Sequence, residues 1–169
     1  MIFLAGVAAS LGFLHLAAKA RIAVGDASER TLDGWRAEVA EFMTLYTRDT
    51  RDNLPDDRSL RQAELKSVGD KLGLSIDKVS LDGLVLKHSQ LLNLGGRLLA
   101  HIAYLAPGDG LVALCIINDG ESEHDLSFEQ RKGQNIIYWS GGGRGFMLIG
   151  ALSRSGLARL AASLAARVG

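Results

Sequence analysis

Residues 84–117 read LVLKHSQLLNLGGRLLAHIAYLAPGDGLVALCII, and this stretch decides the fold class. It holds three apolar runs, separated by Asn93-Leu94-Gly95-Gly96 and by Pro107-Gly108-Asp109-Gly110. Short runs bounded by glycine, asparagine and proline are typical of antiparallel strands joined by tight turns. The third run, LVALCII at 111–117, is apolar at every position, which predicts a central strand covered on both faces.

Two further apolar runs, NIIYW at 135–139 and FMLIG at 146–150, flank the glycine-rich residues 141–145. Phosphate-binding glycine loops lead from a strand into a helix, whereas this loop leads into another strand pattern, so a hairpin is expected. The polar residues between Asn118 and Asp125 are expected to form a solvated acidic loop. The sequence therefore predicts about five antiparallel strands within residues 79–151.

Helical periodicity precedes and follows these strands. In residues 28–73 a first helix is indicated by apolar residues three and four apart, namely Leu32, Trp35, Val39, Phe42, Met43 and Tyr46. A second helix is predicted to be capped by Ser59 with Gln62 and to end at Gly73. A last helix is expected over 153–168, capped by Ser153 or Ser155. Helices followed by a run of strands predict a single α+β domain over residues 21–169.

The first twenty residues are predicted to be a transmembrane anchor. Met1 to Ala18 contain no charged side chain, and eighteen helical residues span about 27 Å, close to the ~30 Å core of a bilayer. Ala18-Lys19-Ala20 resembles a signal-peptide cleavage site, but no Lys or Arg precedes the apolar run. We therefore expect a single-pass membrane protein.

The flanks of this segment bear on orientation and on self-association. Lys19 and Arg21 follow it and, by the positive-inside rule, weakly favour a cytoplasmic C-terminal side. Small residues four apart allow two anchors to pack closely, which leaves a homodimer through the anchor open; they are Gly6 with Ser10 and Ala8 with Gly12.

Charge and cysteine content bear on the expected partners and on the possible cross-links of the chain. Lys plus Arg and Asp plus Glu are balanced at nineteen each, without a basic block, so nucleic acid is not an expected partner. Cys115 is the only cysteine, which excludes an intrachain disulfide framework.

Three residues are candidates for a metal or redox site. A symmetric hairpin about residues 93–96 would place His88 opposite His101, with Cβ atoms about 5 Å apart. A two-residue turn at Gly108-Asp109 would then pair Cys115 with Ile102, whereas a three-residue turn would pair it with His101 and complete a three-ligand set. Both registers stay open, beside the alternative of a polar sheet face with a buried structural cysteine.

Catalytic residues are not predicted. Ser140 lies outside a G-x-S-x-G elbow, because Tyr138 occupies the position that requires glycine. The acidic residues Asp119, Glu121, Glu123 and Asp125 lack EF-hand spacing. We expect a protein that binds rather than an enzyme, without a cofactor.

Several motifs of the strand region resemble a known family. They are Leu91-Leu92 with Gly95-Gly96-Arg97-Leu98-Leu99, the run LVALCII, Gly133-Gln134-Asn135 with Tyr138-Trp139, and Gly145 to Gly150 before the last helix. WRAEVAEFMTLYTRDT at 35–50 likewise looks like a helix that follows a membrane span. Over most of residues 30–168 the chain resembles the C-terminal, extracytoplasmic domain of bacterial membrane-anchored anti-sigma factors, the transmembrane transcriptional regulators of that group.

The resemblance implies a sensor or regulatory domain at the bacterial inner membrane, with residues 21–169 in the periplasm. In that family a cytoplasmic segment binds a sigma factor, whereas this chain starts at the membrane segment and has no H-x₃-C-x₂-C run. Either such a segment lies upstream, or the protein works as a sensor half. The expected function is control of transcription by protein–protein contact. The alternative is a small metal- or redox-responsive domain that uses His88, His101 and Cys115.

Overall fold

The computed structural model describes residues 34–46, 57–75, 80–108, 110–118, 120 and 122–168. These residues form three helices and a six-stranded antiparallel sheet, which confirms the α+β class. The elements are a helix over 34–43, α3 (Arg58–Leu72), β1 (Val85–Leu94), β2 (Arg97–Ala106), β3 (Gly110–Asn118), β4 (His124–Arg131), β5 (Gln134–Gly141), β6 (Arg144–Gly150) and α4 (Arg154–Val168). The chain divides into two compact units, 1–38 and 39–169, and the whole sheet belongs to the second.

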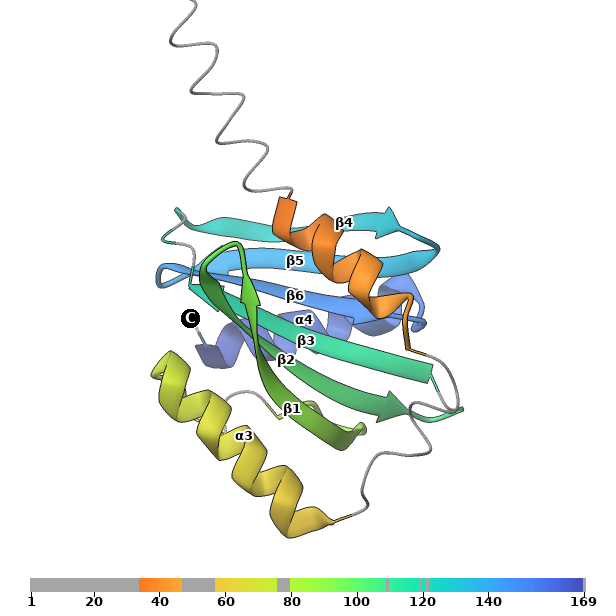
Figure 1. Cartoon of the computed structure of the whole chain (residues 1–169). Coiled ribbons are helices and arrows are strands. Elements are labelled where there is room, and N and C mark those ends of the chain that lie inside the picture. The colour runs from red at the N-terminus through yellow and green to blue at the C-terminus, as the bar shows by residue number, and fades with distance from the viewer. Residues whose placement is uncertain are drawn as a thin grey trace, which may run out of the picture. The chain divides into compact units, whose positions relative to one another are not determined.

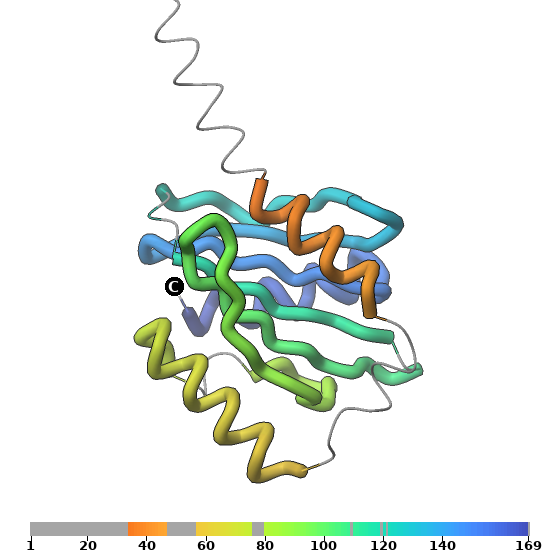
Figure 2. The backbone as a smooth tube through the Cα atoms, in the orientation of Figure 1, coloured from red at the N-terminus to blue at the C-terminus, as the bar shows by residue number. Residues whose placement is uncertain are grey.

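The sheet consists of two three-stranded meanders. Its strand order is β1-β2-β3-β6-β5-β4, so β1–β3 and β4–β6 each pair with their neighbours in sequence. The backbone trace in Figure 2 follows the two meanders in turn. A single antiparallel seam joins them, in which β3 pairs with β6 from Val112 opposite Gly150 to Asn118 opposite Arg144.

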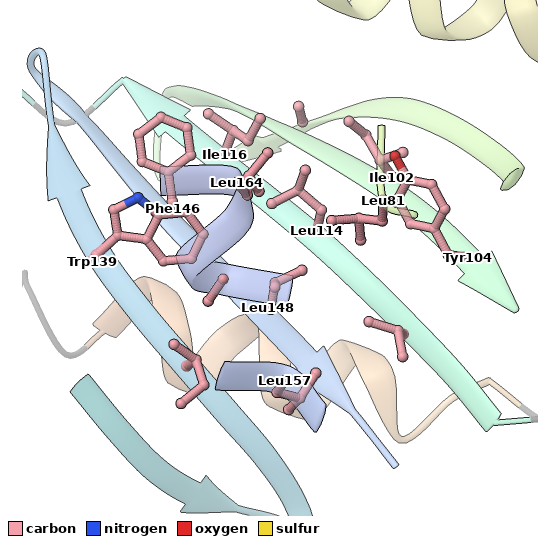
Figure 3. Close-up of a cluster of buried hydrophobic side chains, with 14 of the residues drawn as sticks. Leu81, Ile102, Tyr104, Leu114, Ile116, Trp139, Phe146, Leu148, Leu157 and Leu164 are labelled. Carbon is pink, nitrogen blue, oxygen red and sulfur yellow. The ribbon is translucent and has the colours of Figure 1, made fainter. Parts of the chain in front are cut away.

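One face of the sheet carries the main hydrophobic core (Figure 3). Alternate residues of β2, β3, β5 and β6 meet the apolar sides of α3 and α4 there. Leu65, Val68 and Leu72 come from α3, and Leu157, Ala161 and Leu164 come from α4. All of β3 from Val112 to Ile117 is buried, which confirms that the run 111–117 is a central strand covered on both faces.

The opposite face is covered by residues 39–46, the end of the first helix and the turn after it. Met43 is buried there and its Sδ lies 3.5 Å from the His101 Nε2 of β2. In Figure 1 residues 39–46 lie in front of the strands, while α4 lies behind them. The sheet therefore has helical cover on both faces.

Three helix ends test the sequence signals. Gly73 ends α3 in the left-handed conformation (φ 63°), as predicted. Ser153 begins α4 by accepting a hydrogen bond from the Gly156 N–H at its Oγ. The prediction of Ser59 as the cap of α3 is wrong: the helix begins two residues earlier, and the Asp57 carboxylate accepts from the backbone N–H groups of Ser59 and Leu60.

The sixth strand corrects the expected count of about five. The acidic loop expected from Asn118 to Asp125 ends sooner, because His124 and Asp125 already belong to β4 at the edge of the sheet. Most of its side chains are exposed or half-buried, so the strand lacks the apolar run that marks the others. Backbone pairing with β5 holds it in place, with a register irregularity between His124 and Ser127.

The predicted anchor over residues 1–20 lies outside the described residues, as do Leu32 and the part of the first helix before Gly34. Among the residues that are described, no helix combines the length and the apolar character that a membrane crossing needs.

Candidate functional site

The β1–β2 hairpin turns more tightly than predicted. Its turn is Gly95-Gly96, with φ of 57° and 83°, so Leu94 pairs with Arg97. The register is therefore shifted by two residues, and Gln90 instead of His88 lies opposite His101. In this same register His88 lies opposite Ala103, and an irregularity between His88 and Leu86 changes the pairing only beyond that point. The predicted pairing of His88 with His101 is wrong for this reason.

His88 is instead part of a contact between α3 and β1. Its Nδ1 lies 2.9 Å from Glu64 Oε2, and the same carboxylate oxygen accepts from the Ser89 N–H at 3.1 Å. Both ionisable side chains are mostly buried, and α3 packs more closely on β1 than on any other strand. One carboxylate thus connects a helix to the edge strand of the sheet.

Cys115 does lie opposite His101. Ala106 pairs with Gly110, so three residues connect β2 to β3, and His101 pairs with Cys115 across them. Of the two registers left open by the sequence, the structure has the one with the three-residue connection. Directly paired residues share a face, with Cβ atoms about 5 Å apart. Met147 of β6 continues the same row beyond Cys115.

Residues of the covering segment 39–46 enclose the His101 ring. Tyr46 stacks on it at a centroid distance of 5.6 Å, and Phe42 meets it edge-on at 5.3 Å. Met43 Sδ lies 3.5 Å from Nε2, while Nδ1 is buried without a hydrogen-bond partner. The histidine is fully buried. Its ring is therefore packed against two aromatic rings and a thioether, and the Gln90 side chain opposite it donates to the Tyr46 hydroxyl.

Burial fixes the protonation states of this pair. Desolvation lowers the pKa of His101 from 6.5 to about 4, with a smaller contribution from the positive charge of His88. Desolvation also raises the pKa of the Cys115 thiol far above its ordinary value of 9.0. At neutral pH the pair is therefore a neutral imidazole beside a protonated thiol.

The three candidate ligands do not form one site. His88 is held by Glu64, whereas His101 and Cys115 lie under residues 39–46. Across the described part of the chain, no group of three or more His, Cys, Asp or Glu side chains is arranged to hold a metal ion.

Other polar residues singled out from the sequence have structural roles. Ser140 Oγ donates to the carbonyl of Ser122 at 2.7 Å. Arg144, in the β5–β6 hairpin, donates to the carbonyl of Leu72 at 3.0 Å and so pairs with the C-terminal end of α3. The segment 141–145 is a hairpin connection, as predicted. Of the acidic cluster, Glu123 and Asp125 are exposed, while Asp119 and Glu121 lie outside the described residues.

An apolar groove lies where α4 passes residues 81–84, on the face of the sheet opposite His101. Its volume is about 320 Å³. The apolar part of its lining comes from several elements: Leu81, Leu84, Ala106, Pro107, Leu152 and Leu160. Arg159 and Arg167 of α4 stand at the groove, and Asp82 lines it as well. We call this surface the α4 groove.

Arg167 is fixed in position at the α4 groove. Its guanidinium donates to the carbonyl of Ser80 at 2.7 Å and to that of Ser163 at 3.2 Å. A second hollow, of about 530 Å³, shares Leu81 and Leu84 and continues toward α3. Sequence reasoning missed both, because their walls come from separate segments. The one available signal was Arg159 and Arg167 beside the leucines of the last helix.

No family profile, curated protein or solved structure matches this chain.

Proposed function

We propose that this protein is a membrane-held regulatory domain of the anti-sigma type, which acts in the periplasm by binding a protein partner rather than by catalysis. The α4 groove is the observation that carries the binding role. The glycines in the motifs that carry the family resemblance have structural roles in the sheet. Gly95-Gly96 form the β1–β2 turn, and an added Cβ at Gly150 would lie 2.3 Å from the Leu111 carbonyl oxygen.

The lining of the α4 groove indicates the chemistry of the partner. Leucine side chains leave apolar surface accessible, and covering it with an apolar side chain contributes about 25 cal/mol per Å². The Arg167 guanidinium has five N–H donors. Its bonds to the Ser80 and Ser163 carbonyls leave further N–H groups for a partner. Arg159 adds a second positive charge on the same helix. The groove thus suits a protein segment with an apolar side chain next to a carboxylate.

Asp82 gives the α4 groove a polarity. It lies in the segment opposite α4, so a partner carboxylate is favoured beside Arg159 and Arg167 and disfavoured on the other side. This arrangement restricts the direction in which a peptide segment can lie. It also disfavours nucleic acid as the occupant, because a phosphate backbone would meet the Asp82 carboxylate.

The decisive experiment measures transcription in cells. Deletion of the gene is expected to change the expression of a discrete set of genes, and the full membrane-held chain is expected to restore it. Arg159→Glu reverses one charge at the groove and should fail to restore expression. Arg58→Glu is the matched control, since Arg58 is also exposed but lies at the start of α3.

Two outcomes would contradict the proposal. A deletion strain with unchanged transcription would remove the regulatory role, and full restoration by Arg159→Glu would remove the groove from it. Location is tested separately by fusing a reporter that is active only in the periplasm after Gly25 and after Gly169. Activity at both points is expected, and inactivity at both would place the domain on the cytoplasmic side.

A further inference from the structure

His101 is an ionisable group enclosed by a single covering segment. Three contacts of its ring come from residues 39–46: Met43 at Nε2, Tyr46 on one ring face and Phe42 edge-on. We propose that protonation of His101 releases residues 39–46 from the sheet, so that this segment is an acid-sensitive latch. The latch lies on the face opposite the α4 groove, and it does not depend on the proposed partner.

The geometry suits a neutral imidazole and opposes an imidazolium. A neutral ring has one N–H donor, whereas the protonated ring has two, each of which needs an acceptor. Nδ1 is buried without a hydrogen-bond partner, and Nε2 lies 3.5 Å from the thioether sulfur of Met43, a weak acceptor. A charge formed here would be both desolvated and poorly hydrogen-bonded, which is costly unless the ring becomes exposed to water.

The titratable groups around the ring offer it no negative charge. Burial raises the pKa of Tyr46 in the covering segment and that of Cys115 in β3. Both side chains are therefore neutral at acid pH. His88 of β1 opposes protonation of His101 by its own positive charge. Glu64 of α3 is engaged with His88 and with the Ser89 N–H. In the described residues no carboxylate contacts the His101 ring.

The direction of the effect follows from these contacts. The pKa of His101 is lowered from 6.5 to about 4 while the segment is packed, and it returns toward 6.5 once the segment is released. The released form therefore binds the proton more tightly, and the ratio of released to packed molecules rises as the pH falls through this window. Each unit of difference between the two pKa values can change the ratio of released to packed molecules by up to a factor of ten. Between pH 7 and pH 5 the ratio is expected to rise roughly twentyfold.

Cys115 reports on the latch. It is the only cysteine of the chain, it is fully buried, and it lies next to His101 on the covered face. The test uses the full chain in detergent micelles and an aromatic disulfide that reacts with thiols even in acid. The labelling rate is divided by that of the urea-unfolded chain at the same pH. This relative rate is expected to rise roughly twentyfold from pH 7 to pH 5.

Two variants assign the effect to His101. His101→Leu keeps an apolar side chain under residues 39–46 and removes the titrating group, so its relative labelling rate should be the same at both pH values. His124→Gln removes an exposed histidine on β4 and should behave like the unchanged chain. A flat pH profile in the unchanged chain, or a twentyfold rise that persists in His101→Leu, would overturn the latch.

Hydrogen exchange keeps the test decisive if His101→Leu does not fold. In the unchanged chain at pH 5, corrected for intrinsic rates, amide protection is expected to fall in residues 39–46 and to persist in β3 and β6. Loss of protection over the whole sheet would mean that the thiol is exposed by global unfolding, which also overturns the proposal.

Discussion

His101 and Cys115 lie directly opposite each other on β2 and β3, because three residues instead of two connect these strands. The same register places both side chains on the face that residues 39–46 cover. A pair that would suggest metal or thiol chemistry in an open cleft is here a buried neutral pair. Its surroundings, rather than its residue types, decide its chemistry.

The Cys115 thiol should be inert in the native chain at neutral pH. It is fully buried, and desolvation raises its pKa, so both access and thiolate formation are suppressed. Labelling at pH 7.5 should be slower than in the urea-unfolded chain by at least about a hundredfold, since it requires opening of the structure. Comparable rates in the two states would show that the covered face is open.

The stability of the chain should fall in acid through His101. Its folded pKa is lowered, so the unfolded state binds more protons below pH 6.5, and the free energy of unfolding decreases down to about pH 4. A difference of 2.5 units between 6.5 and about 4 corresponds to a loss of about 3 kcal/mol. Urea unfolding of the unchanged chain and of His101→Leu over this range measures it. Parallel pH profiles for the two would contradict the assignment.

Gly150 should not tolerate a side chain. A Cβ there would lie 2.3 Å from the Leu111 carbonyl oxygen and 2.9 Å from the Val112 Cα, both backbone atoms that cannot move aside cheaply. Gly150→Ala is expected to reduce the free energy of unfolding by about 1–3 kcal/mol or more. Gly141→Ala is the control, because no atom lies within 4 Å of its added Cβ. Thermal unfolding that shifts equally for both would refute this packing.

Glu64 should contribute more to stability than a surface acid on the same helix. Glu64→Ala removes the contacts with His88 Nδ1 and the Ser89 N–H, which join α3 to β1, and should cost about 1–3 kcal/mol. Asp70→Ala removes only the exposed pair with Lys66 and should cost less than about 0.5 kcal/mol. Denaturant unfolding compares the two. Equal losses would mean that the α3–β1 contact is not formed as described.

Sequence reasoning succeeded where one strong local signal decides the structure. The run 111–117 is apolar at every position, and only a strand buried on both faces accommodates that pattern. Gly73 marks the end of α3, because few other residues adopt the left-handed conformation found there. These features require no knowledge of distant partners.

It failed where the outcome depends on pairing. β4 is an edge strand whose polar side chains carry no burial pattern, so only its hydrogen bonds to β5 identify it. The register of the β1–β2 hairpin depends on which two of the residues 93–96 form the turn. Because Gly95-Gly96 form it, His88 does not lie opposite His101. The α4 groove is assembled from segments far apart in sequence, which no local window can combine.

The arrangement of the strands also bears on how the chain folds. Within each meander, β1–β3 or β4–β6, the paired residues are close in sequence, and such hairpins form in roughly 1–10 μs. The pairing of β3 with β6 instead requires closure of everything between them, including two complete strands. We expect docking along this seam to limit the folding rate, so the amides of β3 and β6 that face each other should be the last in the sheet to gain protection.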